Sequence, residues 1–206
     1  MPTPGPGSLK ISLILANPKT GSFCHGLAAA AAEACQALGH SVRFHDLYME
    51  QFLPLLGAEE LRLRKSEDPL VEQHCLEARE ADAFIVVHPN WWGQPPAILK
   101  GWVDRVFRSG LAYGFAEGDG GEGIPRGLLK ARVALVLNTS DTPGERERAV
   151  FGDPLELLWG KCIFPLCGVP RVVRHTYSVM VTSCAEDRAA WMAHAGALVQ
   201  EILRVP

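Results

Sequence analysis

The chain has 206 residues, of which 48% are hydrophobic and 21% are charged. These proportions are ordinary for globular domains and exclude a disordered chain. Its 20 basic and 23 acidic residues leave a formal net charge of -3, which argues against nucleic acid as a partner. Length and composition therefore predict a single domain over residues 1–206, with residues 1–8 as a flexible tail.

The cysteines and the amino-terminal residues indicate the cellular compartment of the protein. Six scattered cysteines form no paired CxxC pattern, which favours reduced thiols and disfavours a metal site or an iron–sulfur cluster. The Pro- and Gly-rich start lacks the basic region of a signal peptide, and no apolar run reaches the roughly 20 residues that span a bilayer. The sequence therefore predicts a soluble, cytoplasmic protein.

Short apolar runs alternate with helical patterns along the chain. Strands are predicted over residues 9–16, 41–48, 82–89, 131–138 and 171–181. Helices are predicted over residues 22–38, 69–81, 96–107, 153–168 and 185–203. Residues 53–68 show no clean period and are expected to be irregular, and residues 118–127 are expected to form a glycine-rich loop.

This order of elements predicts a doubly wound α/β domain. Strands that are apolar on both faces and alternate with helices favour a five-stranded parallel sheet covered on both sides. Ligands of such sheets bind beyond the carboxyl ends of the strands. The loops after Ala16, His88 and Asn138 are therefore the places to look for chemistry.

The first of these loops reads "NPKTGSFCHG" and leads into an alanine-rich helix. The free N–H groups of the first helical turn, the helix dipole and the hydroxyl of Ser22 after Gly21 are suited to holding a phosphate. The alternative is that Ser22 is only a helix N-cap. The loop is neither a GxxxxGK(S/T) nor a GxGxxG motif, which disfavours a nucleoside triphosphatase and a standard dinucleotide fold.

The second loop, within "HPNWWGQPPAILKGW", has two adjacent tryptophans among prolines and a glycine. Prolines end the preceding strand, so Trp91 and Trp92 are expected at the edge of the sheet. They form either a hydrophobic plug against the next helix or a wall for a flat aromatic ligand, with backbone N–H groups toward its polar edge.

The third loop, "NTSDTPGERERAVFGDP", begins with four polar residues, Asn138, Thr139, Ser140 and Asp141. Their hydrogen-bonding groups suit the edge of a heterocycle or a sugar chain. The alternative is a plain turn.

Two segments resemble a known family. "PNWWGQPPAILKGWVDRV" followed by "GLAYGF" resembles the flavodoxin-like NAD(P)H:quinone oxidoreductases, and "NPKTGSFCHGLA" resembles their phosphate loop. The resemblance implies a flavodoxin-like fold and a bound flavin, FMN in preference to FAD. It also implies a ping-pong transfer of two electrons from NADH or NADPH to a quinone or similar acceptor. The family is usually a homodimer.

The resemblance also implies site residues, none of them a catalytic side chain or a metal ligand. The flavin phosphate would lie near Asn17, Gly21, Ser22, Phe23 and Cys24. The isoalloxazine ring would lie along Pro89, Asn90, Trp91, Trp92 and Gly93, with Thr139, Ser140 and Asp141 at its pyrimidine side. Tyr113 would close the pocket from the partner subunit.

The chain departs from the family pattern at several positions. Asn17 stands where the family often has histidine, and Cys24 replaces an asparagine. The third loop reads "TSDTPG" instead of a Thr-Gly-Gly type, and no tyrosine and histidine pair follows it. His175 is treated as a strand or surface residue.

Two other functions stay open. The chain could be an ancillary flavoprotein that regulates a membrane transporter, or a flavodoxin-like electron carrier with weak NAD(P)H turnover. The sequence does not decide between the two nicotinamides or identify the acceptor.

Overall fold

The computed structural model describes residues 7–119 and 122–204, so most of the expected tail and the middle of the glycine-rich loop lie outside the described residues. A parallel sheet runs through its centre in the order β2-β1-β3-β6-β7. Its strands are β1 (Lys10–Leu15), β2 (Ser41–Asp46), β3 (Ala83–Pro89), β6 (Val133–Ser140) and β7 (Arg171–Ser178). The five-stranded doubly wound sheet expected from the sequence is confirmed.

The register of the strands brings the three loops to one edge. Leu15 lies opposite Val87 in the pairing of β1 with β3, and Pro89 lies opposite Thr139 in the pairing of β3 with β6. The strand order reverses between β1 and β3, which is the switch point where open α/β sheets bind ligands.

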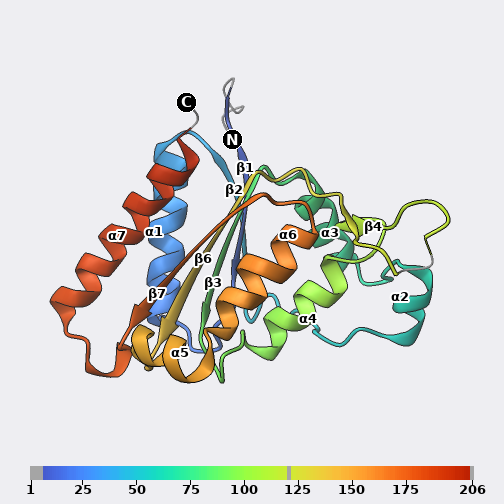
Figure 1. The fold of residues 1–206 in the computed structure, drawn as a ribbon. Helices are drawn as coiled ribbons and strands as arrows, with labels where there is room; N and C mark the ends of the chain where they lie inside the picture. Colours follow the sequence, from blue (N-terminus) through green and yellow to red (C-terminus); the bar gives the residue numbers. More distant parts are fainter. Residues whose placement is uncertain (1–6, 120–121, 205–206) are drawn as a thin grey trace.

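Helices cover both faces of the sheet (Figure 1). The helices α1 (Phe23–Ala37) and α7 (Ala185–Leu203) pack on one face. On the other face lie α3 (Pro69–Glu80), α4 (Ala97–Val106) and α6 (Phe164–Leu166). Alternate residues of each strand therefore enter different apolar layers, as Val86 and Val87 of β3 do, which explains the continuous apolar runs.

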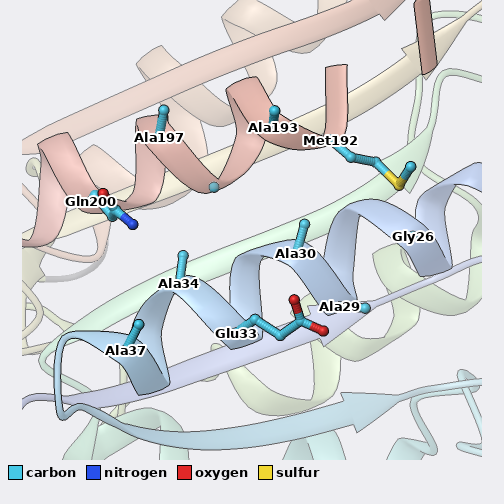
Figure 2. A pocket seen from close by; sticks show the side chains of 11 residues that line it. Gly26, Ala29, Ala30, Glu33, Ala34, Ala37, Met192, Ala193, Ala197 and Gln200 are labelled. Atoms are coloured by element: carbon cyan, nitrogen blue, oxygen red, sulfur yellow. The ribbon is translucent and has the colours of Figure 1, made fainter. Parts of the chain in front are cut away.

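The alanine-rich sequence of α1 suits its packing against α7. Small side chains of both helices line a groove of about 670 Å³ between them (Figure 2). At one end of this groove a Cβ added to Gly26 would lie 3.1 Å from the sulfur of Met192. The small residues thus allow the two helices to approach closely, but they are too short to fill the groove at the surface.

The expectation that residues 53–68 are irregular is wrong over one short stretch, α2 (Ala58–Leu63). This helix buries none of its residues, so it leaves no apolar period in the sequence. It is instead tied to α4 by Glu60, which accepts hydrogen bonds from the buried guanidinium of Arg105. A tertiary ion pair, not local periodicity, fixes its position.

The expectation that residues 138–154 form one polar loop is also wrong. Strand β6 continues to Ser140, and α5 (Gly144–Phe151) follows after a short turn. Its amphipathic signal is absent because no residue of α5 is buried. Acidic residues in its first turn and Arg148 in its last turn complement the helix dipole.

The remaining elements differ from the prediction in detail. Most of the helix expected over residues 153–168 is a π-helix, η1 (Glu156–Ile163). Strand β7 ends at Ser178 and a short 3-10 helix, η2 (Met180–Thr182), follows it. The pairing of β4 (Tyr113–Gly114) with β5 (Arg126–Gly127) forms a small ladder that sequence reasoning missed. None of the helices in the described parts of the chain is long and apolar enough to cross a membrane.

Candidate functional site

The two adjacent tryptophans form a tight hairpin at the carboxyl end of β3. The backbone N–H of Trp91 donates to the carbonyl of Gln94, and the N–H of Gln94 donates to the carbonyl of Trp91, both at 3.0 Å. The two residues between them, Trp92 and Gly93, have φ angles of 56° and 70°. This two-residue turn has positive φ at both positions, as type I′ hairpins do.

The turn exposes Trp92 completely, with 101% of its reference surface accessible. Positive φ is uncommon for a bulky residue and is unfavourable by about 1–2 kcal/mol. Such strain clusters at functional sites. Gly93 is required at its position, because a Cβ there would lie 2.9 Å from a side-chain carbon of Pro154. Trp92 is therefore not a hydrophobic plug against the next helix, and Trp91 is itself 45% exposed.

Asn90 ties this hairpin to the third loop. Its backbone N–H donates to the carbonyl of Thr139 at 2.7 Å, and its side-chain amide donates to Glu147 of α5 at 3.1 Å. Its side-chain oxygen is buried and has no hydrogen-bond partner among the described residues. A buried acceptor without a partner is costly, so this position suits a donor from a ligand.

The amino end of α1 is open to an anion. Ser22 occupies the N-cap position, but its side chain makes no capping hydrogen bond, and the first turn carries no acidic residue. Its hydroxyl instead lies 2.9 Å from Nδ1 of His25. Ser22 is therefore the N-cap residue by position, but its side chain does not cap the helix. The N–H groups of Phe23 and Cys24 have no intrahelical partner, as at any helix start.

A direct contact joins the first loop to the third. The thiol of Cys24 lies 3.4 Å from the hydroxyl of Thr139, and both residues are buried. Burial raises the pKa of Cys24, so the thiol stays protonated near neutral pH. Together with the contacts of Asn90, this places the three loops in one continuous edge.

Buried polar residues support the hairpin from behind. The indole N–H of Trp159, on η1, donates to Nε2 of His88 at 3.0 Å, and Nδ1 of His88 lies 2.8 Å from the carbonyl of Pro89. Complete burial lowers the pKa of His88 to about 4, so the ring is neutral and its Nδ1–H donates to that carbonyl. Asn138 adds its amide nitrogen 2.8 Å from Nε2 of the same ring. This network fixes the backbone from which the hairpin starts.

Two adjoining cavities open at this edge. One of about 470 Å³ is lined by Asn90, Trp92, Gly93, Thr142, Phe151 and Pro154. The other, of about 250 Å³, is lined by more polar residues that include Asn90, Ser140, Asp153, Arg174 and Thr176. The first lies in the size range of small-molecule sites. Asn90 and Glu147 line both cavities, so the two form one region.

Arg174 supplies the polar cavity with a guanidinium that is already paired. It forms ion pairs with Asp153 and with Glu156, the latter at 3.1 Å. Its remaining hydrogen bonds go to Asn138 and Thr176. These partners occupy the charge of Arg174, so its guanidinium is not a free cation for a ligand. Sequence reasoning missed Arg174, Glu147 and His88, since only the fold brings their strands and helices together.

The predicted site residues divide into two groups. The first, second and third loops supply a continuous set, in which Asn17 closes a turn by accepting from the N–H of Lys19 at 2.9 Å. Asp141 turns away, because its carboxylate accepts from the N–H of Val181 at 2.8 Å. Tyr113 lies on β4 beside the far end of α4, away from α5 (Figure 1), so within one chain it does not reach the cavities.

A separate histidine cluster has metal-like spacing but the wrong hydrogen bonds. Atoms of His45, Glu50 and His74 lie within 4.8 Å of one another. The indole N–H of Trp102 donates to Nδ1 of His74 at 2.8 Å, which places the ring proton on Nε2, the atom that faces Glu50 at 3.2 Å. A protonated nitrogen cannot ligate a metal. The cluster is therefore better described as a buried charge network, in which His45 bridges Glu50 and Glu77.

The family that the sequence resembles is confirmed by comparison with known proteins. Residues 9–202 match the family described as having a flavodoxin-like fold. The chain belongs to this family. The assignment covers all five strands of the sheet, including the carboxyl-terminal third, where the sequence motifs are least specific.

Two flavodoxin-like relatives show the range of similarity. An uncharacterised NAD(P)H oxidoreductase of Escherichia coli is 36% identical over 111 residues, which are 52% of this chain and 57% of the relative. The ribosyldihydronicotinamide dehydrogenase (quinone) of Rattus norvegicus is 30% identical over 175 residues, covering 73% of this chain and 72% of the relative. The chain thus spans little more than half the length of several curated relatives that it matches.

Solved flavodoxin-like structures confirm the fold. The NAD(P)H:quinone oxidoreductase from Methanothermobacter marburgensis has a TM-score of 0.81 at 24% identity, covering 97% of this chain and 99% of that one. An FMN-dependent NADH-azoreductase from Bacillus anthracis, solved in complex with FMN, has a TM-score of 0.73 at 16% identity, covering 95% and 100%.

Proposed function

We propose that this protein is a flavin-dependent NAD(P)H oxidoreductase that passes two electrons to a quinone or a similar flat acceptor. The observation that carries the proposal is the meeting of three loops at the switch point, with an exposed tryptophan hairpin beside a cavity of about 470 Å³. The names of the matched relatives, NAD(P)H oxidoreductase and a quinone dehydrogenase, support it. We prefer FMN to FAD, because the FMN-dependent azoreductase shares the fold.

The residues at this edge fit a flavin. The uncapped N–H groups of Phe23 and Cys24 would hold a phosphate, since a helix N-terminus attracts anions. The buried side-chain oxygen of Asn90, which has no partner in the described parts of the chain, would accept an N–H from the ring. The fully exposed indole of Trp92 would cover the flavin ring and so gain an apolar contact. A bound flavin would supply the hydride chemistry, and the chain supplies binding and orientation.

The chain's own contribution is a rigid polar frame. The neutral ring of His88 holds the carbonyl of Pro89, and the hairpin that follows is closed by two backbone hydrogen bonds. The N–H groups at the turn, Trp92 and Gly93, would face negative charge on a reduced ring as preorganised dipoles. No side-chain nucleophile is needed for this reaction.

We also propose that the working unit is a homodimer. The distance of Tyr113 from the cavities of its own chain is consistent with its resemblance-implied role in closing the site of the partner. Homodimers in which both chains carry Tyr113→Ala should then have lower activity than wild type. Mixed dimers of Y113A with a variant defective in flavin binding should recover part of the activity at one site.

Steady-state kinetics with NADH and NADPH on a panel of quinones tests the activity. We expect parallel double-reciprocal lines, as for a ping-pong cycle, and extraction with mass spectrometry should identify the flavin. Intersecting lines would contradict the ping-pong cycle. Turnover confined to one-electron acceptors would instead favour a flavodoxin-like electron carrier.

A further inference from the structure

A serine, a histidine and an aspartate form a hydrogen-bonded relay at the amino end of α1. Ser22 Oγ lies 2.9 Å from His25 Nδ1, and His25 Nε2 lies 3.1 Å from Asp46 Oδ2 at the end of β2. The side chains of His25 and Asp46 are 21% and 10% exposed. Neither His25 nor Asp46 is among the site residues expected from the sequence, so their role is open.

The direction of the hydrogen bonds follows from the carboxylate. Oδ1 of Asp46 accepts from the backbone N–H groups of Tyr48 and Met49 at 3.1 and 3.2 Å, which fixes the side chain. A carboxylate only accepts, so Nε2 of His25 donates to it. In the neutral ring Nδ1 is then an acceptor, and the hydroxyl of Ser22 donates to it. The hydroxyl hydrogen is consequently turned toward the histidine and is not offered to a ligand.

A proton on His25 reverses the second bond. When Nδ1 carries a hydrogen it donates to Ser22 Oγ, and the hydroxyl hydrogen is free to point toward an anion at the helix start. There it joins the uncapped N–H groups of Phe23 and Cys24. The cationic ring also attracts the anion, so a phosphate favours the protonated form of His25.

We propose that His25 and Asp46 complete the phosphate subsite, and that His25 Nδ1 takes up one proton from solvent when the flavin phosphate binds. This inference rests on the proposed function, because it assigns the phosphate of the flavin to this helix start. It adds two residues that position the hydroxyl of Ser22, and it makes the affinity for a phosphate dependent on pH.

The side chains around His25 include few charged groups that could compete with a bound phosphate. Within the described parts of the chain, Asp46 is the one charged side chain at ion-pair distance from it. At this end of α1, helix α7 contributes Trp191 against Phe23 and Met192 against Gly26, all uncharged. The neighbouring His45 of β2 pairs instead with Glu50 and Glu77.

Calorimetric titration with flavins tests the inference. Wild type is titrated with FMN, FAD and riboflavin at about pH 7, in two buffers whose ionisation enthalpies differ, so that the heat reports protons exchanged. FMN carries a phosphate that itself titrates near pH 6, so each result is compared with that of His25→Gln. Riboflavin has the same ring without the phosphate. As a control, His40→Gln alters a histidine at the far end of α1, where it contacts Leu203.

We expect up to one proton to be taken up with FMN or FAD by wild type and by His40→Gln, and less by His25→Gln. His25→Gln loses the charge-assisted hydrogen bond from the protonated ring to Ser22. This loss should weaken FMN binding on the order of 10-fold at pH 6 and leave riboflavin binding unchanged. Asp46→Asn should have the same direction of effect. Equal proton uptake by wild type and His25→Gln, or uptake with riboflavin, would overturn the inference while the proposed function stands. Failure of wild type to bind any flavin would overturn both.

Discussion

At the scale of single residues, the site depends on side chains whose exposure or protonation is unusual for their type. Trp92 is wholly exposed at the tip of a strained turn, and the ring of His88 is neutral because it is buried. Two adjacent tryptophans were a visible signal in the sequence. His88 was visible only as part of the quoted stretch, since its partner Trp159 lies 71 positions further along the chain.

Replacing Trp92 with alanine separates binding from stability. We expect the affinity for flavin to fall by about 0.5–1.5 kcal/mol, roughly 2- to 10-fold in Kd, because an aromatic contact is lost. The melting temperature should not fall, since this side chain buries no surface in the fold. Trp159→Phe is the matched comparison, because it removes a buried donor and should lower the melting temperature. Equal flavin affinity in W92A and wild type would contradict the assignment of the hairpin.

The cysteines give a second test at this scale. Cys162 and Cys184 are exposed, whereas the other four are buried. Burial raises the pKa of Cys35 and of Cys167 to about 12, so both stay protonated and protected. Alkylation of the native protein should therefore add two groups by intact mass, and alkylation after denaturation should add six. Rapid native labelling of Cys24 would show that the first loop opens more than the structure indicates.

At the scale of elements, regular strands and buried helices were predictable and surface helices were not. The central strands β1, β3 and β6 were found because they are apolar on both faces, β2 because its residues alternate, and α4 because its apolar residues share one side. The helices α2 and α5 bury no residue, so their sequences carry no hydrophobic period. Contacts with residues far away in the sequence fix them, such as Glu60 with Arg105 and Glu147 with Asn90.

Two glycine substitutions in helices should have opposite effects. A Cβ at Gly101 of α4 would lie 2.2 Å from the backbone oxygen of Pro54, so Gly101→Ala should destabilise the fold by about 1–3 kcal/mol or more. At Gly196 of α7 the nearest atoms lie 3.9 Å away, and Gly196→Ala should stabilise by about 0.5–1 kcal/mol. Denaturant unfolding measures both. A stabilising Gly101→Ala would mean that the loop at Pro54 does not pack on α4.

At the scale of the whole molecule, the fold joins a phosphate loop, a hairpin and a polar strand end that are far apart in sequence. The sequence predicted which three loops would meet, because the carboxyl ends of parallel strands share one edge. It could not predict which side chains within those loops face the site. Asp141 turns toward Val181, and Asn90, which was expected only along the flavin ring, also links the second loop to α5.

The buried cluster around His45 should shape the dependence of stability on pH. Burial lowers the pKa of His45, but its hydrogen bonds to Glu50 and Glu77 outweigh burial and raise it. Its stabilisation is then complete below its ordinary value near 6.5 and is lost as pH rises through the raised value. Burial raises the pKa of Glu50, but bonds from His45 and His74 outweigh it and lower the pKa to about 2. That stabilisation is complete above about 4.5 and is lost as pH falls toward 2.

We therefore expect the melting temperature to be highest between these two limits and to fall on either side. His45→Gln should be less stable than wild type at slightly acidic pH and should lack the decline that wild type shows as pH rises through the raised pKa of His45. Melting curves at a series of pH values check this. A wild-type profile that falls no more steeply than that of H45Q above pH 6.5 would contradict the charge network.

The most direct test of the flavin account is anaerobic spectroscopy of the purified chain incubated with FMN or FAD. We predict one flavin per chain with a visible spectrum that bleaches on addition of NADH or NADPH and returns on addition of a quinone. A colourless chain that takes up neither flavin, or a bound flavin that neither nicotinamide bleaches, would contradict it.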